Sequence, residues 1–565
     1  MRRVSFLKEW AGPDLGKTPR QRAIILVVSL GLLLFIWHRN YNLLGDLYDY
    51  SGLASANGHL EAGLRPYRDF NCPYQSLPLY LGYAAEMVFG RRYLAQAYAN
   101  LAFGLAFYFL LLLRLKPGVP FYPRVIAATA LCVCTFFQHS MLWYNSVGMM
   151  LLCLACLQAV KIFRADRIKA WDVAQLCLWI YLSSMTKINF HALTLGLVVL
   201  ILAARFWLHP GDFKALLLVV VALILSGCVF GFATELTINH TTFADFIENV
   251  IRVPSGRAGD INKLFTFNMF FWTVQHNYPD DLSMGVYGLL LLLYLRCLER
   301  YGWFGKIATS TPDSREALFV RYCALAALPV VLISSALLTV SNMETQVLTS
   351  SFLLAGFLCV YLLLERALPE AQRRVLLSSI FLFGAYFLVI GSGSAYMHSR
   401  LRFGDAPWSG SVALNAYQQR RVSAVLDGLP YYEAKSISPQ LEPYFAGVYF
   451  TERAKNRLAK VAAFMSRTHP DGDGRDVYWG PGFEMLNRVY GSRYEGRLPL
   501  WYHYNVSFRE QDVPGIVAEL KRQNFQWVVC AANAHHLPQG IQDYLTAEFK
   551  QIEQDEILVY QRVHH

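Results

Sequence analysis

Long apolar segments follow one another along the first two thirds of the chain, and they limit the folds it can adopt. A helix that crosses a bilayer needs about 20 mostly apolar residues, and lipid leaves the backbone no other partner than the helix itself. The sequence therefore predicts a polytopic α-helical membrane protein with about 11 to 13 transmembrane helices. The candidate segments are residues 23–41, 77–90, 94–114, 124–143, 145–163, 172–186, 189–208, 213–234, 284–300, 318–340, 346–366 and 375–396.

The charged residues are few, and they are distributed as in a membrane protein. They make up 16% of the sequence, against about 25% in average soluble proteins. The net charge is +11, but the basic residues fall largely between the apolar segments, which is the positive-inside pattern. The sequence has no basic stripe with interleaved aromatic residues of the kind that binds nucleic acid. We therefore expect membrane lipids and no nucleic acid among the partners.

The loops between the apolar segments predict the orientation of the chain. Residues 1–22 form a basic tail, and the first apolar segment has no small-residue cleavage site after it, so we expect a retained anchor with a cytosolic N-terminus. Two later basic loops belong inside, which places loop 235–283 and everything after residue 397 outside. This orientation requires that one segment between residues 42 and 235 does not cross fully, or that one further span is present there. The short segment 77–90 is therefore a candidate for a broken or re-entrant helix.

The last third of the chain is more polar and has a mixed pattern. Helical periodicity occurs in residues 451–467 and 511–524, and strand-like runs occur at 476–480, 526–531 and 557–563. Alternation of helix and strand predicts a small α/β domain, which lies outside the membrane if the orientation is right. The expected organisation is a cytosolic tail (1–22), a transmembrane domain (23–396) with outer loops 42–76 and 235–283, and a C-terminal extracytoplasmic α/β domain (397–565).

Outer loop 42–76 gathers charged side chains just past the first apolar segment. Asp46 and Asp49 are three residues apart, so they share a face on a helical turn. Residues 50–63 have apolar and small side chains three and four apart, which predicts an amphipathic helix in the membrane plane. Solvated carboxylates that cap such a helix are one interpretation of the two Asp residues. Catalysis by at least one of them is the other.

Several motifs in this order resemble a known enzyme family. A basic tail, one helix, an acidic residue and an in-plane helix are followed by "GLRPYRDF" (63–70), a proline-led second span and "FG" (89–90). "SSMTKINFHALTLG" (183–196) places a threonine-lysine pair at the head of an apolar helix. The whole resembles the GT-C glycosyltransferases that use polyprenyl-phosphate sugars, such as protein O-mannosyltransferases and the lipid A aminoarabinose transferase. The Asp-Glu pair of the mannosyltransferases is not matched at Asp46, which leaves the acceptor class open.

The resemblance implies an inverting transfer, in which an acceptor hydroxyl attacks the anomeric carbon of a sugar held on a lipid phosphate. A carboxylate must accept the hydroxyl proton, and we expect Asp46, or otherwise Asp49, to be this general base. A cation must stabilise the departing phosphate. No metal ligands are assigned, and a divalent cation as cofactor stays open. The expected substrate-binding residues are Arg65, Arg68 and Lys187 for the phosphate, Asp69 for the acceptor or a metal, and Tyr67 and Tyr74 for stacking on sugar or lipid.

The predicted function is thus transfer of a sugar to an acceptor on the outer face of a bacterial inner membrane. Lipopolysaccharide, a lipid-linked glycan and a protein are all open as acceptors. Two other classes of protein also remain as alternatives. A transporter or flippase of lipid-linked sugars predicts inverted repeats and ionisable residues at mid-bilayer, of which only Lys187 is a candidate. A non-catalytic glycan-assembly scaffold would tolerate loss of the loop carboxylates.

Overall fold

The computed structural model describes most of the chain, in several parts. These are residues 18–44, 47, 49–73, 75–137, 141–254, 346–365, 432–491, 497–500, 502, 507–532 and 537–563, with isolated positions between 370 and 388. The apolar segments expected at 284–300 and 318–340, and the part of outer loop 235–283 after residue 254, lie outside the described residues.

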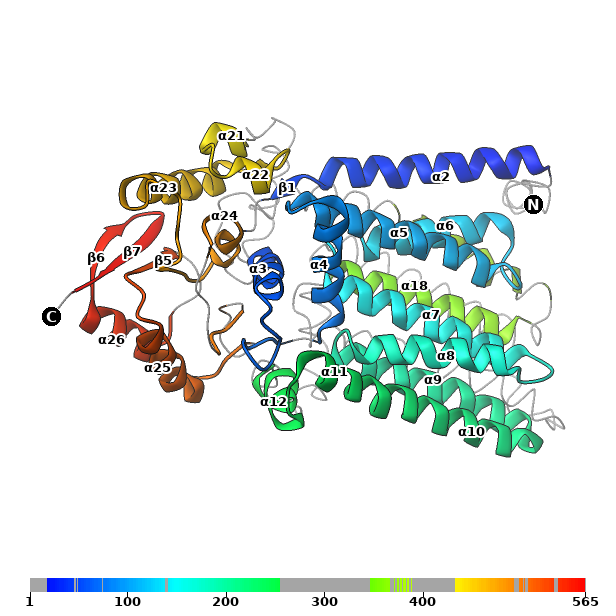
Figure 1. Ribbon diagram of the computed structural model, residues 1–565. Helices are drawn as coiled ribbons and strands as arrows, with labels where there is room; N and C mark the ends of the chain where they lie inside the picture. Colours follow the sequence, from blue (N-terminus) through cyan, green and yellow to red (C-terminus); the bar gives the residue numbers. More distant parts are fainter. Residues whose placement is uncertain are drawn as a thin grey trace, which may run out of the picture.

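The membrane part is a bundle of apolar helices that run side by side (Figure 1). Among the described residues, five helices are long and apolar enough to cross a membrane, namely Pro19–His38, Leu94–Leu115, Tyr144–Arg164, Ile188–Leu208 and Pro210–Asn239. The expected polytopic α-helical fold is confirmed. The elements of the bundle are α2 (Pro19–Asn40), α5 (Leu94–Leu115), α6 (Phe121–Thr135), α7 (Tyr144–Arg164), α8 (Ala170–Ser184), α9 (Ile188–Leu208), η1 (Pro210–Asp212), α10 (Phe213–Ile224), the π-helix η2 (Leu225–Gly231), α11 (Phe232–Asn239) and α18 (Gln346–Leu364).

The helix α7 forms the centre of this bundle, because 94% of its apolar window is buried. Its last carbonyls, which have no partner within the helix, are satisfied by Arg205 of α9. The Arg205 guanidinium donates to the carbonyls of Ile162, Phe163 and Ala165 at 2.7, 3.0 and 2.6 Å, and it is ion-paired with Asp212 at 2.6 Å. These contacts fix α7 and α9 to each other at the end of the bundle opposite the C-terminal region.

Two helices lie across the other end of the bundle. Both α3 (Asp49–Glu61) and α4 (Leu77–Phe89) are labelled there in Figure 1, where α4 runs crosswise to α5 and α8. The segment at 77–90, expected to be broken or re-entrant, is therefore a short helix at the end of the bundle. The short helices α12 (Phe243–Ile247) and η3 (Glu248–Arg252) follow the bundle at the same end.

The C-terminal region combines a four-stranded sheet with helices. The strand order is β4-β5-β7-β6, with β4 parallel to β5 and the other pairs antiparallel. The helices and strands expected at 451–467, 511–524, 476–480, 526–531 and 557–563 are all present. They are α23 (Glu452–Thr468), α25 (Val513–Gln523), β4 (Val477–Trp479), β5 (Trp527–Ala531) and β7 (Ile557–Arg562), which are joined by α21 (Ala434–Ile437), α22 (Glu442–Phe445), η5 (Glu484–Leu486), α24 (Asn487–Tyr490), η6 (Glu510–Asp512), α26 (Gln539–Glu548) and β6 (Phe549–Gln554).

A second, small sheet joins the C-terminal region to the loop after α2. Its central strand β3 (Tyr449–Phe450) pairs in parallel with β1 (Leu43–Leu44) and antiparallel with β2 (Tyr432–Glu433). The segment that follows the first membrane helix is thus hydrogen-bonded to residues about 400 positions later in the chain. Backbone hydrogen bonds therefore join the C-terminal region to the segment that follows α2 at this end of the bundle.

Candidate functional site

The described residues of outer loop 42–76 lie between the bundle and the C-terminal region. Asp49 is the first residue of α3, at the end of that helix where backbone N–H groups favour a carboxylate. Asp46 and Tyr74 lie outside the described residues. The helix expected over 50–63 is present as α3, but its surroundings differ from the expectation. Ser51 and Asn57 are each 0% exposed. Protein covers them instead of water, because the Ser51 hydroxyl accepts from the backbone N–H of Met485 in the C-terminal region and Asn57 donates to Glu86 of α4.

Arg68 and Asp69 are paired with each other in the loop after α3. Asp69 accepts hydrogen bonds from Arg68 Nε at 2.9 Å and Nη2 at 2.7 Å, and from the backbone N–H of Arg65 at 2.7 Å. Partial burial raises the pKa of the Asp69 carboxyl, but the donors from Arg68 and Arg65 outweigh it and hold the pKa below its usual value. Both planar groups are thereby oriented at the surface of the loop, with Asp69 ionised at neutral pH.

Tyr67 anchors the same loop in the interior. Its side chain is 0% exposed, and its backbone has a φ of 66°, a left-handed conformation that is uncommon for a bulky residue. Its hydroxyl donates to Glu235 Oε2 of α11 at 3.4 Å. Glu235 also accepts from the backbone N–H of Ser76 at 3.0 Å, from the Ser76 hydroxyl at 2.8 Å and from Asn239 Nδ2 at 3.1 Å. A buried carboxylate thus holds the loop to the end of a membrane helix.

Glu235 was missed by the sequence analysis, which ended the apolar segment at residue 234 and began an outer loop there. The structure continues the helix to Asn239, so the loop starts five residues later than predicted. The signal in the sequence is the pair Glu235 and Asn239, four residues apart and therefore on one face of a continuing helix.

Lys187 lies where three helices begin. It is the N-cap residue of α9, its Nζ donates to Asn145 Oδ1 at 3.1 Å, and it stands 4.9 Å from the centre of the Tyr144 ring at the start of α7. The start of α4 joins them, because the backbone N–H of Leu77 donates to the Met185 carbonyl at 2.9 Å. Helix N-termini carry partial positive charge and bind anions. The three N-termini and the Lys187 ammonium together form a region suited to a phosphate.

Two buried polar side chains near these N-termini have no hydrogen-bond partner among the described residues. They are Gln75, of which both amide atoms lack a partner, and the hydroxyl of Ser146; both side chains are 0% exposed. Leaving such a group unsatisfied costs about 1–3 kcal/mol. Gln75 precedes the N-cap of α4 and Ser146 is in the first turn of α7. Both residues therefore belong to helix starts that meet near Lys187.

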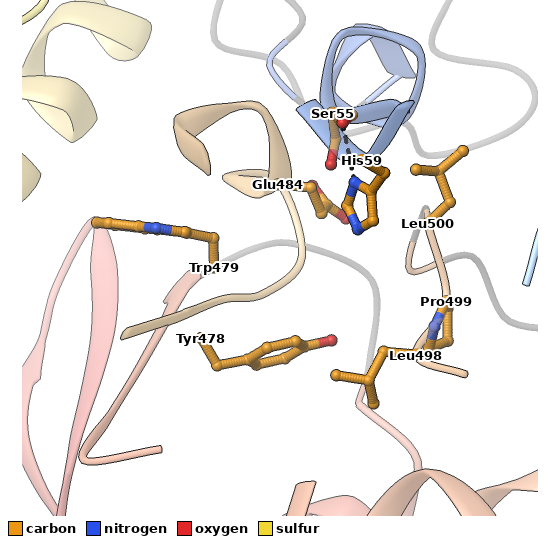
Figure 2. A pocket seen from close by; sticks show the side chains of 8 residues that line it. All are labelled: Ser55, His59, Tyr478, Trp479, Glu484, Leu498, Pro499 and Leu500. Carbon is orange, nitrogen blue, oxygen red and sulfur yellow. Dashed lines mark hydrogen bonds between the residues drawn. The ribbon is translucent and has the colours of Figure 1, made fainter. Parts of the chain in front are cut away.

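A separate small pocket lies between α3 and the C-terminal region. His59 and Ser55 of α3 line it from one side, and Glu484, Tyr478 and Trp479 from the other (Figure 2). The pocket has room for about one water molecule, so it is too small for a sugar. Among the described residues, no group of three His, Cys, Asp or Glu side chains could hold a metal ion.

No protein-family model matches the sequence, and no curated protein sequence does. Among solved structures, the chain is similar to ArnT, the lipid A aminoarabinose transferase, from Cupriavidus metallidurans. In the crystal structure bound to undecaprenyl phosphate the identity is 12%, over 96% of this chain and 98% of that chain, with a TM-score of 0.47. In the apo state the identity is 12%, over 96% and 97%, with a TM-score of 0.44.

The oligosaccharyltransferase of Archaeoglobus fulgidus is also similar, at 13% identity over 90% of this chain and 68% of that chain, with a TM-score of 0.32. Both neighbours are GT-C glycosyltransferases, the family that the sequence motifs resemble. The overlap is too loose to carry residue roles from these proteins to this chain.

Proposed function

We propose that this protein is a glycosyltransferase of the bacterial inner membrane, which moves a sugar from a polyprenyl-phosphate carrier to an acceptor hydroxyl at the outer face. The observation that supports this most is the meeting of three helix N-termini around Lys187. The buried Gln75 and Ser146, which have no hydrogen-bond partner among the described residues, belong to two of these helix starts. A lipid phosphate matches both the positive charge of this region and its position at the end of the helix bundle. Its hydrocarbon chain stays among the membrane helices while its headgroup reaches the end of the bundle.

In this proposal the phosphate is held before, during and after the transfer. Lys187 and the N-terminal N–H groups of α7 and α9 offset the negative charge that grows on the phosphate as the bond to the sugar breaks. The first N–H of α4 is already bonded to the Met185 carbonyl. Gln75 and Ser146 supply hydrogen bonds to its oxygens or to the first sugar hydroxyl. The Lys187 ammonium is a compact charge, so it suits a phosphate without demanding one orientation.

The acceptor is deprotonated by a carboxylate of the outer loop, for which Asp49 and Asp46 are the candidates. The acceptor oxygen forms a bond to the anomeric carbon, the bond from that carbon to the phosphate oxygen breaks, and the hydroxyl proton moves to the carboxylate. The configuration inverts and polyprenyl phosphate leaves. Arg65 and Arg68 are further candidates for the phosphate and Asp69 is the candidate for orienting the acceptor, while Tyr67 keeps the loop in place.

The experiment measures donor binding and transfer separately, in the purified protein in lipid nanodiscs. Retention of radiolabelled polyprenyl phosphate is compared between the native protein, Lys187→Ala and a matched control, Lys214→Ala, an exposed lysine at the opposite end of the bundle. We expect about a tenfold or larger loss of affinity for Lys187→Ala, as for loss of a buried charged contact of about 1.5–3 kcal/mol, and none for Lys214→Ala.

Transfer is then followed with a polyprenyl-phosphate sugar and an envelope extract as the pool of acceptors. Asp49→Asn and Asp46→Asn are each tested with the protein still folded, and loss of transfer in one of them with donor retention intact identifies the base. Full transfer in both variants would contradict the proposed mechanism. Movement of the labelled lipid across the bilayer without any transfer would favour a flippase, and neither activity would favour a scaffold.

A further inference from the structure

Arg488 of the C-terminal region is buried between the two helices that lie across the end of the bundle. One end of its guanidinium is ion-paired with Glu61 of α3, and the other end with Glu86 of α4. The side chains of Arg488 and Glu86 are 2% and 3% exposed, whereas Glu61 is 40% exposed. The Arg488 side chain of α24 therefore connects α3 to α4, and its pair with Glu86 is shielded from water.

The contacts around this pair hold the guanidinium and the buried carboxylate in one orientation. Glu86 also accepts hydrogen bonds from Asn57 Nδ2 at 2.6 Å and from the Tyr444 hydroxyl at 3.2 Å. The Arg488 guanidinium lies 5.7 Å from the centre of the Tyr444 ring. Buried charges persist in proteins when other donors and acceptors surround them. Here Glu86 is satisfied in this way, whereas Arg488 Nε has no hydrogen-bond partner among the described residues.

The fit between α24 and α3 is close. Asn487 Nδ2 donates to the Ser55 hydroxyl at 2.9 Å, and a Cβ atom added at Gly58 would lie 3.1 Å from Arg488 Cδ. Gly58 thus lets the Arg488 chain pass over α3. The backbone N–H of Met485 donates to the Ser51 hydroxyl at 2.8 Å, one helical turn earlier. The C-terminal region therefore contacts α3 along most of its length in one register.

The contacts of Arg488 with Glu61 and Glu86 and the proposed reaction centre lie at opposite ends of the same two helices. Glu61 is the last residue of α3 and Glu86 is in the last turn of α4, while Asp49 begins α3 and the phosphate region begins α4. We propose that Arg488 is a positioning residue, which fixes α3 and its base relative to the phosphate-binding start of α4. This inference rests on the proposed function.

The test uses the full chain in nanodiscs and the variant Arg488→Lys. Lysine keeps the positive charge, but it lacks the planar fork that pairs with two carboxylates at once. Arg457→Lys is the matched control, since Arg457 is ion-paired with Glu556 within the C-terminal region and has 14% side-chain exposure. Glu61→Gln, which weakens only the more exposed branch, is the milder second variant in case Arg488→Lys does not fold.

Three quantities are measured for each variant: kcat at saturating donor, retention of polyprenyl phosphate, and hydrogen–deuterium exchange of α3 and α4. We expect kcat to fall about 10- to 100-fold in Arg488→Lys, as for a misplacement of about 1 Å, and by less in Glu61→Gln. Donor retention should stay within about twofold, and exchange should rise in α3 and α4 but not in β5. Arg457→Lys should change none of the three.

Native kcat in Arg488→Lys, or equal losses of kcat and donor retention, would overturn the inference. Unchanged exchange of α3 and α4 would overturn it as well, and this readout does not depend on the reaction. A native protein that transfers no sugar would instead refute the proposed function. Exchange would then still decide whether Arg488 holds the two helices together.

Discussion

Glu235 accepts two hydrogen bonds from Ser76, one from its backbone N–H at 3.0 Å and one from its hydroxyl at 2.8 Å, across 159 residues of sequence. Ser76 is the N-cap residue of α4, and Glu235 is 0% exposed on α11. A buried carboxylate is tolerated only when donors surround it. The end of a membrane helix therefore fixes the start of α4, where the proposed phosphate region begins.

The variant Glu235→Ala should destabilise the protein and weaken its hold on the donor. It removes the shared acceptor of Ser76, Tyr67 and Asn239, and each buried donor left unsatisfied costs about 1–3 kcal/mol. We expect the free energy of unfolding to fall by about 2 kcal/mol or more, with reduced retention of polyprenyl phosphate. Thermal unfolding in detergent measures the first effect. Glu235→Gln should lose less, and the exposed Glu510→Gln should lose nothing; equal stability of all three would show that Glu235 does not anchor the loop.

The membrane helices could be predicted from the sequence because their length and apolar content are local properties. The segments expected at 94–114 and 189–208 are helices at Leu94–Leu115 and Ile188–Leu208. The crosswise α4 was also foreseen in part, since 77–90 is too short to span a bilayer of ordinary thickness. Such features require no knowledge of what lies far along the chain.

The surroundings of these helices could not be predicted, because they depend on distant segments. An amphipathic pattern over 50–63 indicates a helix with one polar face, but it does not tell whether water or protein covers that face. Here Ser51 and Ser55 contact residues more than 400 positions away. The region around Lys187 likewise forms only when the starts of α4, α7 and α9 come together. The role of Glu235 was not predicted, because a single carboxylate beside an apolar segment is as typical of a helix end as of a buried side chain that holds a loop.

Gly231 permits a close approach of the π-helix η2 to α8, and alanine there should disturb it. An added Cβ would lie 1.9 Å from Ser184 Oγ, whereas Gly196 on α9 has open space around it. Overpacking of this kind costs about 1–3 kcal/mol, so Gly231→Ala should lower the thermal unfolding temperature. Gly196→Ala should not, because alanine is the better helix former. Ser184→Ala should restore part of the loss in the double variant; no loss at Gly231 would mean that η2 packs elsewhere.

Glu484 should make the protein less stable as the pH rises. Burial raises the pKa of its carboxyl to about 7, although backbone N–H groups of Gly482 and Tyr502 donate to it at 3.0 and 3.2 Å. Between pH 4.5 and 7 the unfolded chain is ionised at this residue while the native one is protonated, so stability falls with rising pH by about 3 kcal/mol. The difference in unfolding free energy between native protein and Glu484→Gln, followed from pH 4.5 to 7.5, measures this. A constant difference would mean that the carboxyl is not buried.

His59, in the same pocket, should act in the opposite direction. Burial lowers the pKa of its imidazole to about 4, and the charge of Arg488 adds to this, while the hydrogen bond with the Ser55 carbonyl opposes it. Between pH 6.5 and 4 the unfolded chain binds a proton that the native protein refuses, so stability should fall by about 3 kcal/mol as the pH is lowered.

The variant His59→Asn isolates this effect, since an asparagine amide can replace His59 Nδ1, which lies 2.9 Å from the Ser55 carbonyl oxygen. The unfolding free energy of native protein minus that of His59→Asn should fall as the pH drops from 7 to 4. The effects of His59 and Glu484 oppose each other between about pH 4.5 and 6.5, so their two contributions largely cancel there, and each single variant should reveal the slope of the other group. Parallel curves for both variants would show that the two side chains are not buried in one pocket.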